Sequence, residues 1–169
     1  IKDRTQQVDR RGGATYKISP FKLIINDGYY YVLAWNAQRG STITFRLDRM
    51  KGVEILNEPR EGNMEFSKID MEAYTQQHFG MFSGDLERVT LNCTIRLLET
   101  MIDRFGLENV TYIPVSKSHF NVRISVYISD QFYGWLCGLG KRVKIISPEY
   151  VANDYKAFLD KIRKMYDSD

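Results

Sequence analysis

The sequence predicts an α+β protein in which a small antiparallel β-barrel precedes a ferredoxin-like α/β unit. Two patterns carry this prediction. Between residues 16 and 56, short runs of aromatic and β-branched residues alternate with glycine turns, as in small barrels. From residue 89 onward the pattern is strand, helix, strand, strand, helix, strand, the ferredoxin-like order, with one helix added. The 169 residues can hold one or two small domains with hydrophobic cores.

The strands of the first unit are marked by their turns. A first strand is expected to end near Pro20, because proline cannot donate to a β-ladder. The Asn-Asp-Gly run at 26–28 predicts a hairpin turn, since Asp and Gly tolerate positive φ. Arg39 and Gly40 form the next predicted turn. The predicted strand segments are 16–18, 21–25, 29–36, 42–48 and a short closing strand at 53–56.

Residues suited to helix caps mark the predicted helix boundaries in the second unit. Thr94 and Ser129 suit N-cap positions, Gly106 and Gly140 suit helix ends, and Pro148 suits the first turn of a final helix. The predicted strands are 89–93, 110–115, 120–128 and 143–146. The final helix is expected to bury Val151, Tyr155, Phe158, Leu159 and Ile162. The predicted domains are a barrel at 1–57, a linker at 58–84 with a helix at 67–79, and the ferredoxin-like unit at 85–169.

Composition indicates an ordinary soluble protein. Hydrophobic residues make up 43% and charged residues 27%, and the net charge of +3 is well below that of typical sequence-blind duplex binders. No run of about 18 apolar residues is present, so no membrane span is predicted. The two cysteines, Cys93 and Cys137, have neither metal-site spacing nor a disulfide framework, which favours reduced thiols and a cytoplasmic location.

No catalytic constellation is visible, so we expect neither enzymatic activity nor a cofactor. The two histidines, His78 and His119, have no Ser, Cys or carboxylate partner at a triad-like spacing. A packing or capping role is expected for the first and solvation for the second. No ligand-like spacing predicts a metal site. The Gly138-Leu139-Gly140-Lys141 run has the wrong spacing for a phosphate-binding loop and precedes a strand instead of a helix.

Aromatic and arginine residues cluster in two predicted strands. Residues 29–35 include three consecutive tyrosines and a tryptophan, and in the following strand Phe45 and Leu47 alternate with Arg46 and Asp48. Arginines on a sheet beside tyrosines suit phosphates and stacked bases. The periodicity is equally typical of an aromatic barrel core with solvated arginines at its rim. The pattern alone leaves both interpretations open.

These segments resemble the WYL domain of bacterial transcription regulators. The family's Trp-Tyr-Leu tripeptide corresponds to residues 30–32, where Tyr30 and Val32 depart from the motif. Residues 18–21 match the flanking segment before the tripeptide, and 45–49 match the Phe-Arg-x-Asp-Arg strand after it. Three later segments look like the C-terminal extension of such regulators: 79–82, 102–106 and 131–136.

The resemblance implies an Sm/SH3-like barrel that senses nucleic acid or a nucleotide. A winged helix-turn-helix and a first barrel strand are expected ahead of residue 1, and the arm at 1–9 is expected to cover the open barrel edge or to be ordered by a neighbouring chain. By position, Tyr31 is the central tyrosine of the tripeptide, Arg46 and Arg49 are the strand arginines, and Ser19 lies in the preceding segment. The implied ligand site is Ser19, Tyr31, Arg46 and Arg49, with Lys17, Lys22 and Arg39 extending it.

The leading hypothesis is therefore the effector-sensing and dimerising region of a transcription regulator. Its partners would be a single-stranded nucleic acid or nucleotide effector, operator DNA through the absent domain, and a second copy in a homodimer. The rivals are a free-standing single-strand nucleic-acid-binding accessory protein and an enzyme acting on nucleotides. The effector, the target genes and the sign of regulation are not specified by the residues.

Overall fold

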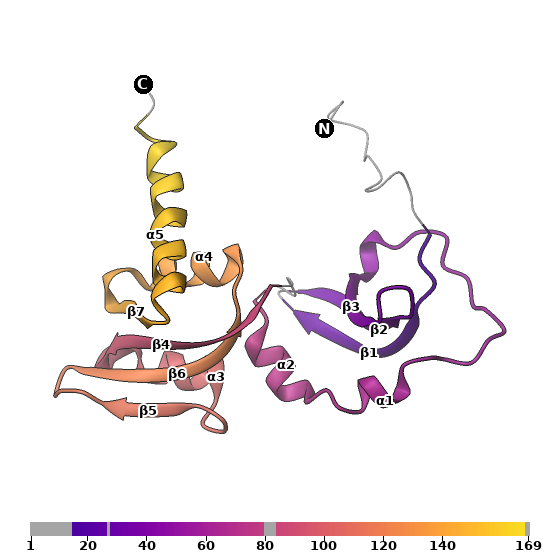
Figure 1. The fold of residues 1–169 in the computed structure, drawn as a ribbon, viewed down its shortest axis with the longest axis horizontal. Coiled ribbons are helices and arrows are strands. Elements are labelled where there is room, and N and C mark those ends of the chain that lie inside the picture. Colours follow the sequence, from indigo (N-terminus) through magenta and orange to yellow (C-terminus); the bar gives the residue numbers. More distant parts are fainter. Residues whose placement is uncertain (1–14, 27, 80–83, 168–169) are drawn as a thin grey trace. The chain divides into compact units, whose positions relative to one another are not determined.

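A computed structural model describes residues 15–26, 28–79 and 84–167, and the chain divides into two compact units (Figure 1). The first unit is Ile1–Ile69 and the second is Asp70–Asp169. The predicted linker at 58–84 spans this division. The arm predicted at 1–9 lies outside the described residues.

The first unit is built on three antiparallel strands, β1 (Ser19–Asn26), β2 (Tyr29–Asn36) and β3 (Ser41–Arg46), in the order β1-β2-β3. Their aromatic and β-branched residues favour extended backbone. Gly28 and Gly40 have φ of 77° and 59° in the two predicted turns, a conformation that glycine adopts without steric cost. The two predicted hairpins are confirmed.

The end of the first strand was predicted wrongly. Pro20 lies inside β1, and the register with β2 shifts between Pro20 and Lys22. A proline is tolerated here because β1 is at the edge of the described sheet and pairs only with β2. The Pro20 carbonyl accepts a hydrogen bond from Nη1 of Arg60, at 3.1 Å.

The described part of the first unit forms an open sheet and no closed barrel. The strand predicted at 53–56 is absent: these residues pair with no strand, and the Ile55 side chain is 99% exposed. β3 ends at Arg46, and the last residues of the predicted 42–48 strand instead enter a short 3-10 turn, η2 (Leu47–Arg49). The α+β class is therefore confirmed, whereas the predicted closing strand is wrong.

The chain then returns to the first sheet and packs on it. The short helix α1 (Asn63–Phe66) places Phe66 in a stack on Phe21 of β1, with ring centroids 4.5 Å apart. The backbone N–H of Glu61 donates to the Ser19 hydroxyl at 2.9 Å. Gly62 lies against the indole ring of Trp35. These contacts fix residues 60–66 along β1 and β2.

The second unit contains a four-stranded sheet in the order β5-β6-β4-β7, with every neighbouring pair antiparallel. The element order is strand, helix, strand, strand, helix, strand, followed by a final helix, as the sequence predicts. The strands are β4 (Leu86–Thr94), β5 (Thr111–Pro114), β6 (His119–Tyr127) and β7 (Val143–Ser147). The helices are α2 (Met71–Gln77), α3 (Leu98–Phe105), α4 (Asp130–Leu139) and α5 (Glu149–Lys164), with 3-10 turns η3 (Ile95–Leu97) and η4 (Gly140–Arg142).

The core of this unit lies on one face of the sheet. Val89 and Leu91 of β4 are fully buried opposite Ile124 and Val122 of β6, as expected when alternate residues point to the same side. Helices α3, α4 and α5 contribute to the same cluster. Phe132 and Tyr133 are buried within it and Trp135 packs against it. Its helical members include Met101, Phe105, Phe132, Leu136 and Val151.

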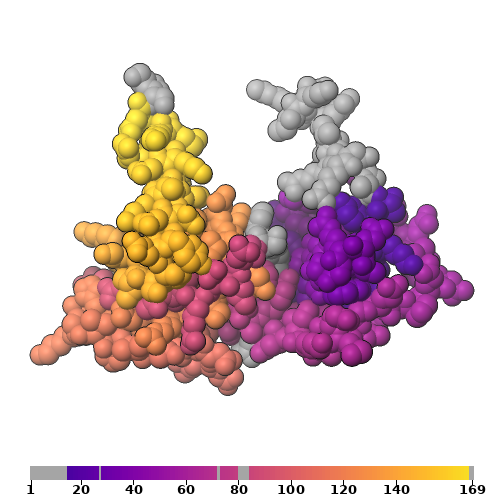
Figure 2. All heavy atoms as spheres, in the orientation of Figure 1, coloured from indigo at the N-terminus to yellow at the C-terminus, as the bar shows by residue number. Residues whose placement is uncertain are grey.

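Two helices differ from the predicted ones. The helix predicted at 67–79 is shorter than expected: only α2 falls within that range, Asp70 begins it by accepting the Ala73 N–H at 3.1 Å, and α1 ends before the range starts. In α5, Val151 is buried as predicted, but Leu159 and Ile162 are 40% and 39% exposed. Figure 2 shows why: the C-terminal part of this helix projects beyond the rest of its unit. Within the described residues, no helix is long and apolar enough to cross a membrane.

Candidate anion-binding site

One face of the first sheet brings together Tyr29, Tyr31 and Arg46, which we call the Tyr31 face. Tyr31 of β2 is directly opposite Arg46 of β3, so both side chains emerge on the same side of the sheet. Tyr29 is two residues from Tyr31 and shares that side. The guanidinium carbon of Arg46 lies 3.8 Å from the Tyr29 ring centroid, which is a close cation–π contact.

Asp48 holds the Arg46 guanidinium in a bidentate ion pair. Nε of Arg46 donates to Oδ1 at 2.8 Å and Nη2 donates to Oδ2 at 2.7 Å. The η2 turn makes this pair possible because it folds Asp48 back toward the end of β3. The hydrogen bond raises the pKa of Arg46 and lowers the pKa of Asp48, so both stay charged near neutral pH. The guanidinium is therefore oriented as well as charged.

The far side of the guanidinium remains open. An arginine has five N–H donors, and Asp48 takes one on Nε and one on Nη2. Toward the residues that the structure describes, the two donors on Nη1 and the second on Nη2 make no hydrogen bond. The Arg46 side chain is 20% exposed and the Asp48 side chain 52%. A planar pair of donors facing solvent is the geometry that binds a phosphate or carboxylate through two hydrogen bonds.

The other predicted site residues are spread more widely. Arg49 is exposed in the η2 turn beside Asp48, and Lys22 is exposed on the same side as Tyr31, opposite Leu33. Ser19 uses its hydroxyl to accept the Glu61 N–H. Lys17 forms an ion pair with Glu58, whose hydrogen bond raises the pKa of the lysine.

Arg39 is the most distant member of the predicted site. It lies in the turn after β2, which ends at Asn36, and that end of the strand is roughly 17 Å from Tyr31 at the usual strand rise. Its backbone N–H donates to the Asn36 side chain at 3.0 Å. The structure thus brings Tyr31 and Arg46 together, keeps Arg49 and Lys22 nearby, and separates Arg39 from them.

Sequence reasoning missed the two residues that support Arg46, Tyr29 and Asp48. Tyr29 was within the aromatic run, and its two-residue separation from Tyr31 was the available signal. Asp48 was assigned to a strand, where it would stand beside Arg46 without turning back toward it. Its role depends on the η2 turn, which no local motif marks.

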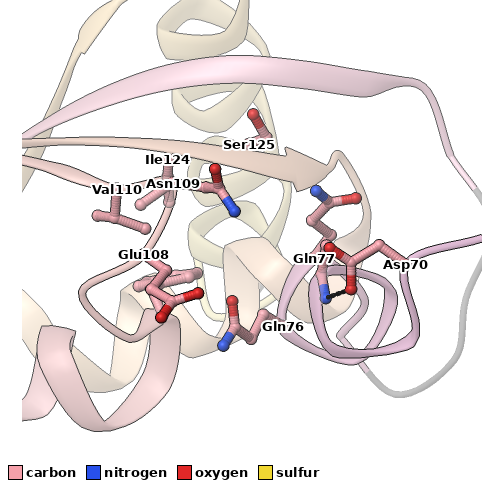
Figure 3. A pocket seen from close by; sticks show the side chains of 10 residues that line it. Asp70, Gln76, Gln77, Glu108, Asn109, Val110, Ile124 and Ser125 are labelled. Carbon is pink, nitrogen blue, oxygen red and sulfur yellow. Dashed lines mark hydrogen bonds between the residues drawn. The ribbon is translucent and has the colours of Figure 1, made fainter.

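A cavity in the second unit has a different character (Figure 3). It is bordered by α2, the end of α3, the loop after α3 and β6, and its volume is about 70 Å³. This is well below the roughly 300–1,000 Å³ of pockets that hold small molecules, so the cavity does not suit a nucleotide. Its lining includes Asp70, Gln76, Glu108, Asn109 and Ser125. Two carboxylates in the lining also disfavour an anion, so the cavity is not a site for the predicted effector.

His78 has the packing role predicted for it. Its ring is 5% exposed and lies between the rings of Tyr74 and Tyr127, each with its centroid 3.9 Å away. Nδ1 donates to the Tyr74 carbonyl at 2.7 Å, and burial lowers the pKa of the imidazole. Among the described residues, no three His, Cys, Asp or Glu side chains are arranged to hold a metal ion.

Residues 6–55 match the model of the WYL domain family. The chain contains a WYL domain. This match covers β1, β2, β3 and the η2 turn, and therefore the whole Tyr31 face. The chain has no match among curated proteins.

Two solved structures resemble the chain over most of its length. Proteasome accessory factor B/C (PafBC) of Arthrobacter aurescens is 20% identical with a TM-score of 0.43, covering 90% of this chain and 23% of that one. A CRISPR Cas-related protein is 14% identical with a TM-score of 0.50, covering 88% of this chain and 42% of that one. The chain thus spans less than half the length of either protein. At this identity the second likeness concerns the fold alone.

Proposed function

We propose that this WYL-domain chain is the effector-sensing region of a transcription regulator, and that its Tyr31 face binds a phosphate group of a nucleotide or single-stranded nucleic acid. The observation that carries the proposal is the Arg46 guanidinium, which Asp48 orients through two hydrogen bonds and Tyr29 supports from below at 3.8 Å. An arginine serving only as a solvated rim residue has no need of two fixed supports.

The chemistry of the proposed contact follows from this geometry. The open donors on Nη1 and Nη2 would grip two oxygens of one phosphate, a bidentate contact that a lysine cannot reproduce. Tyr31, directly opposite Arg46, would stack on a base or donate its hydroxyl to the same phosphate. Arg49 and Lys22 would extend the contact to a neighbouring phosphate. Because Asp48 offsets one positive charge, recognition would rest on geometry more than on net charge.

The regulatory arrangement is part of the same proposal. The second unit, which we interpret as a ferredoxin-like extension, would pair with a second copy in a homodimer, and operator DNA would be bound by a further domain outside this sequence. Leu159, Ile162 and Met165 form an exposed apolar stripe at the end of α5, with Met165 75% exposed. An apolar stripe of this kind favours a protein contact. Effector binding would then act by biasing the geometry of the dimer.

The decisive experiment is a titration of labelled single-stranded DNA, RNA and cyclic dinucleotides against the wild type and Arg46→Ala. We expect the variant to lose about 1.5–3 kcal/mol of binding free energy, the range for hydrogen bonds to charged groups. Arg46→Lys should lose a substantial part of it, because it keeps the charge and loses the planar fork. Arg39→Ala removes the same side chain from the far end of β2 and should bind as the wild type does. Equal affinity of the Arg46 and Arg39 variants for every ligand would place any binding site elsewhere.

A further inference from the structure

The sheet of the second unit has a polar face opposite its core. Because alternate residues of a strand point to opposite sides, the residues between the buried Val89, Leu91 and Cys93 all emerge on this second side. Their cross-strand partners share it. This polar face has three rows of residues paired across the strands. The rows are Arg88 with Ser125, Thr111 with Arg123 and Thr90, and Ile113 with Asn121, Asn92 and Lys144.

The core helices leave this side of the sheet uncovered. The apolar contacts of α3, α4 and α5 all belong to the cluster on the opposite side. His78, the residue after α2, bounds the polar face at one end, where its ring packs against Tyr127. Arg88 and Arg123 are both exposed. Ser125 lines the cavity beside α2 together with Asp70 and Glu108, so the open part of the face runs across β6, β4 and β7 beyond Ser125.

The charged strand residues of the polar face are all of one sign. Arg88 is opposite Ser125, two residues from Arg123, which makes the two arginines diagonal neighbours at about 7–8 Å. Lys144 stands opposite Asn92 on the neighbouring strand. None of the strand residues on this face is a carboxylate, and neither arginine forms a hydrogen bond or ion pair with any described residue. These two arginines differ in this respect from Arg46, whose charge is balanced by Asp48. Two unbalanced like charges on adjacent strands repel each other, and an anion between them relieves the repulsion.

The remaining side chains on this face offer hydrogen bonds between the cations. Nδ2 of Asn92 donates to Oδ1 of Asn121 at 2.8 Å, which fixes both amides in the middle of the sheet. This bond leaves the Asn92 carbonyl oxygen and the Asn121 amino group available to a ligand. An amide presents the donor and acceptor that base edges require. In a duplex these edges lie within the grooves, whereas in a single strand they can be splayed onto a flat surface.

We propose that this polar face binds single-stranded nucleic acid, with Arg88, Arg123 and Lys144 contacting phosphates and the Asn92–Asn121 pair contacting a base edge. Four strands give a surface roughly 14 Å across, which a flexible strand can cross obliquely. The site is distinct from the Tyr31 face and does not depend on it. It would give the second unit a binding role of its own.

The test compares Arg88→Gln/Arg123→Gln with Lys156→Gln/Lys161→Gln, which removes the same charge from exposed positions of α5. All variants carry Arg46→Ala in the full chain, so that binding at the Tyr31 face does not mask the result. The probe is a fluorescein-labelled oligothymidylate of about 15 nucleotides, comparable to known single-strand site sizes. Affinity is measured by fluorescence anisotropy over a series of salt concentrations, and circular dichroism confirms that each variant is folded.

We expect the arginine pair to weaken binding at least tenfold more than the lysine pair. The slope of log affinity against log salt should become shallower by about 1.4, because each lost phosphate contact on a single strand accounts for about 0.7. Asn92→Ala should weaken binding without changing that slope. Equal affinity and equal slope for the two charge-matched variants would overturn the proposal. So would tighter binding of a duplex of the same length, since the face would then recognise backbone charge alone. Neither result would bear on the Tyr31 face, which the Arg46→Ala comparison tests separately.

Discussion

Replacing Gly62 with alanine should destabilise the first unit through one identifiable contact. Gly62 precedes α1 and has a φ of 80°, in the left-handed region. A Cβ atom built there would lie 2.2 Å from Cγ of Trp35 and 2.6 Å from Cδ1 and Cδ2. The nearest atom, Cγ, is bonded to Cβ of Trp35, whose backbone pairs with both neighbouring strands, so it cannot move away as the tip of a flexible side chain would. The segment carrying Gly62 would have to shift instead.

The expected cost has two parts. A left-handed conformation costs a non-glycine residue about 1–2 kcal/mol. Forcing an extra methyl group into a close-packed contact costs about a further 1–3 kcal/mol. Together they predict a loss of roughly 2–5 kcal/mol in the free energy of unfolding. Gly40→Ala is the matched control: φ is 59° and no atom lies within 4 Å of the added Cβ, so only the first cost of about 1–2 kcal/mol applies.

Each unit contains one tryptophan, Trp35 in the first and Trp135 in the second. In a Trp135→Phe background, Trp35 fluorescence during urea titration reports on the first unit, and the slope of the transition converts its midpoint to free energy. Gly62→Ala should unfold at clearly lower urea than Gly40→Ala. If the two variants lost the same stability, the close packing of Gly62 on Trp35 would be refuted and only the backbone cost would remain.

Two further predictions concern the second unit and the assembly. Burial lowers the pKa of His78 in the folded state below its unfolded value of about 6.5. The contribution of the neutral imidazole to the free energy of unfolding is therefore present above that pH and is lost as pH falls through the folded pKa. Urea midpoints followed by Trp135 fluorescence should drop on acidification in the wild type and drop less in His78→Gln. The proposed homodimer should appear in light scattering at micromolar concentration with twice the mass of the 19.8 kDa chain. The double variant Ile162→Asp/Met165→Asp should shift this mass toward that of the monomer. A wild-type mass of one chain, with or without ligand, would reject the dimer.

Local patterns predicted the elements whose boundaries are themselves local. β2 was expected at 29–36 and occupies Tyr29–Asn36, because glycine turns flank a run of aromatic and branched residues. The Ser129 cap was likewise predictable, and its hydroxyl accepts the Phe132 N–H at 3.3 Å. Such signals act within a few residues. The antiparallel pairing of β4 and β6, by contrast, joins residues 25 to 41 positions apart, from Thr94–His119 to Leu86–Tyr127, and was expected only from the order of the elements.

The errors arose where a segment depended on a distant partner. Val53 and Ile55 have strand-like side chains, but a strand requires a neighbour for its ladder, and the described residues provide none there. In α5 the helical spacing correctly predicted one apolar stripe. It could not indicate that the unit ends before the helix does, which leaves Ile162 at the surface. Periodicity defines which side chains share a face, whereas burial depends on how far the opposing surface extends.

In the candidate site, too, the strand positions followed from the local pattern, whereas the contacts of individual atoms did not. The sequence placed Tyr31 and Arg46 on neighbouring strands, and the register confirms that they are opposite one another. Whether Arg46 is a solvated rim residue or an organised ligand-binding group depended on contacts that no spacing encodes. The carboxylate that orients it belongs to a turn where the pattern predicted more strand, and the ring beneath it is Tyr29, outside the tripeptide. An arginine fixed on two sides with donors left open has already lost much of its side-chain freedom before a ligand arrives. The entropy cost of binding is correspondingly smaller, which is the physical reason to prefer Arg46 over the other cations of the first unit as the primary phosphate contact.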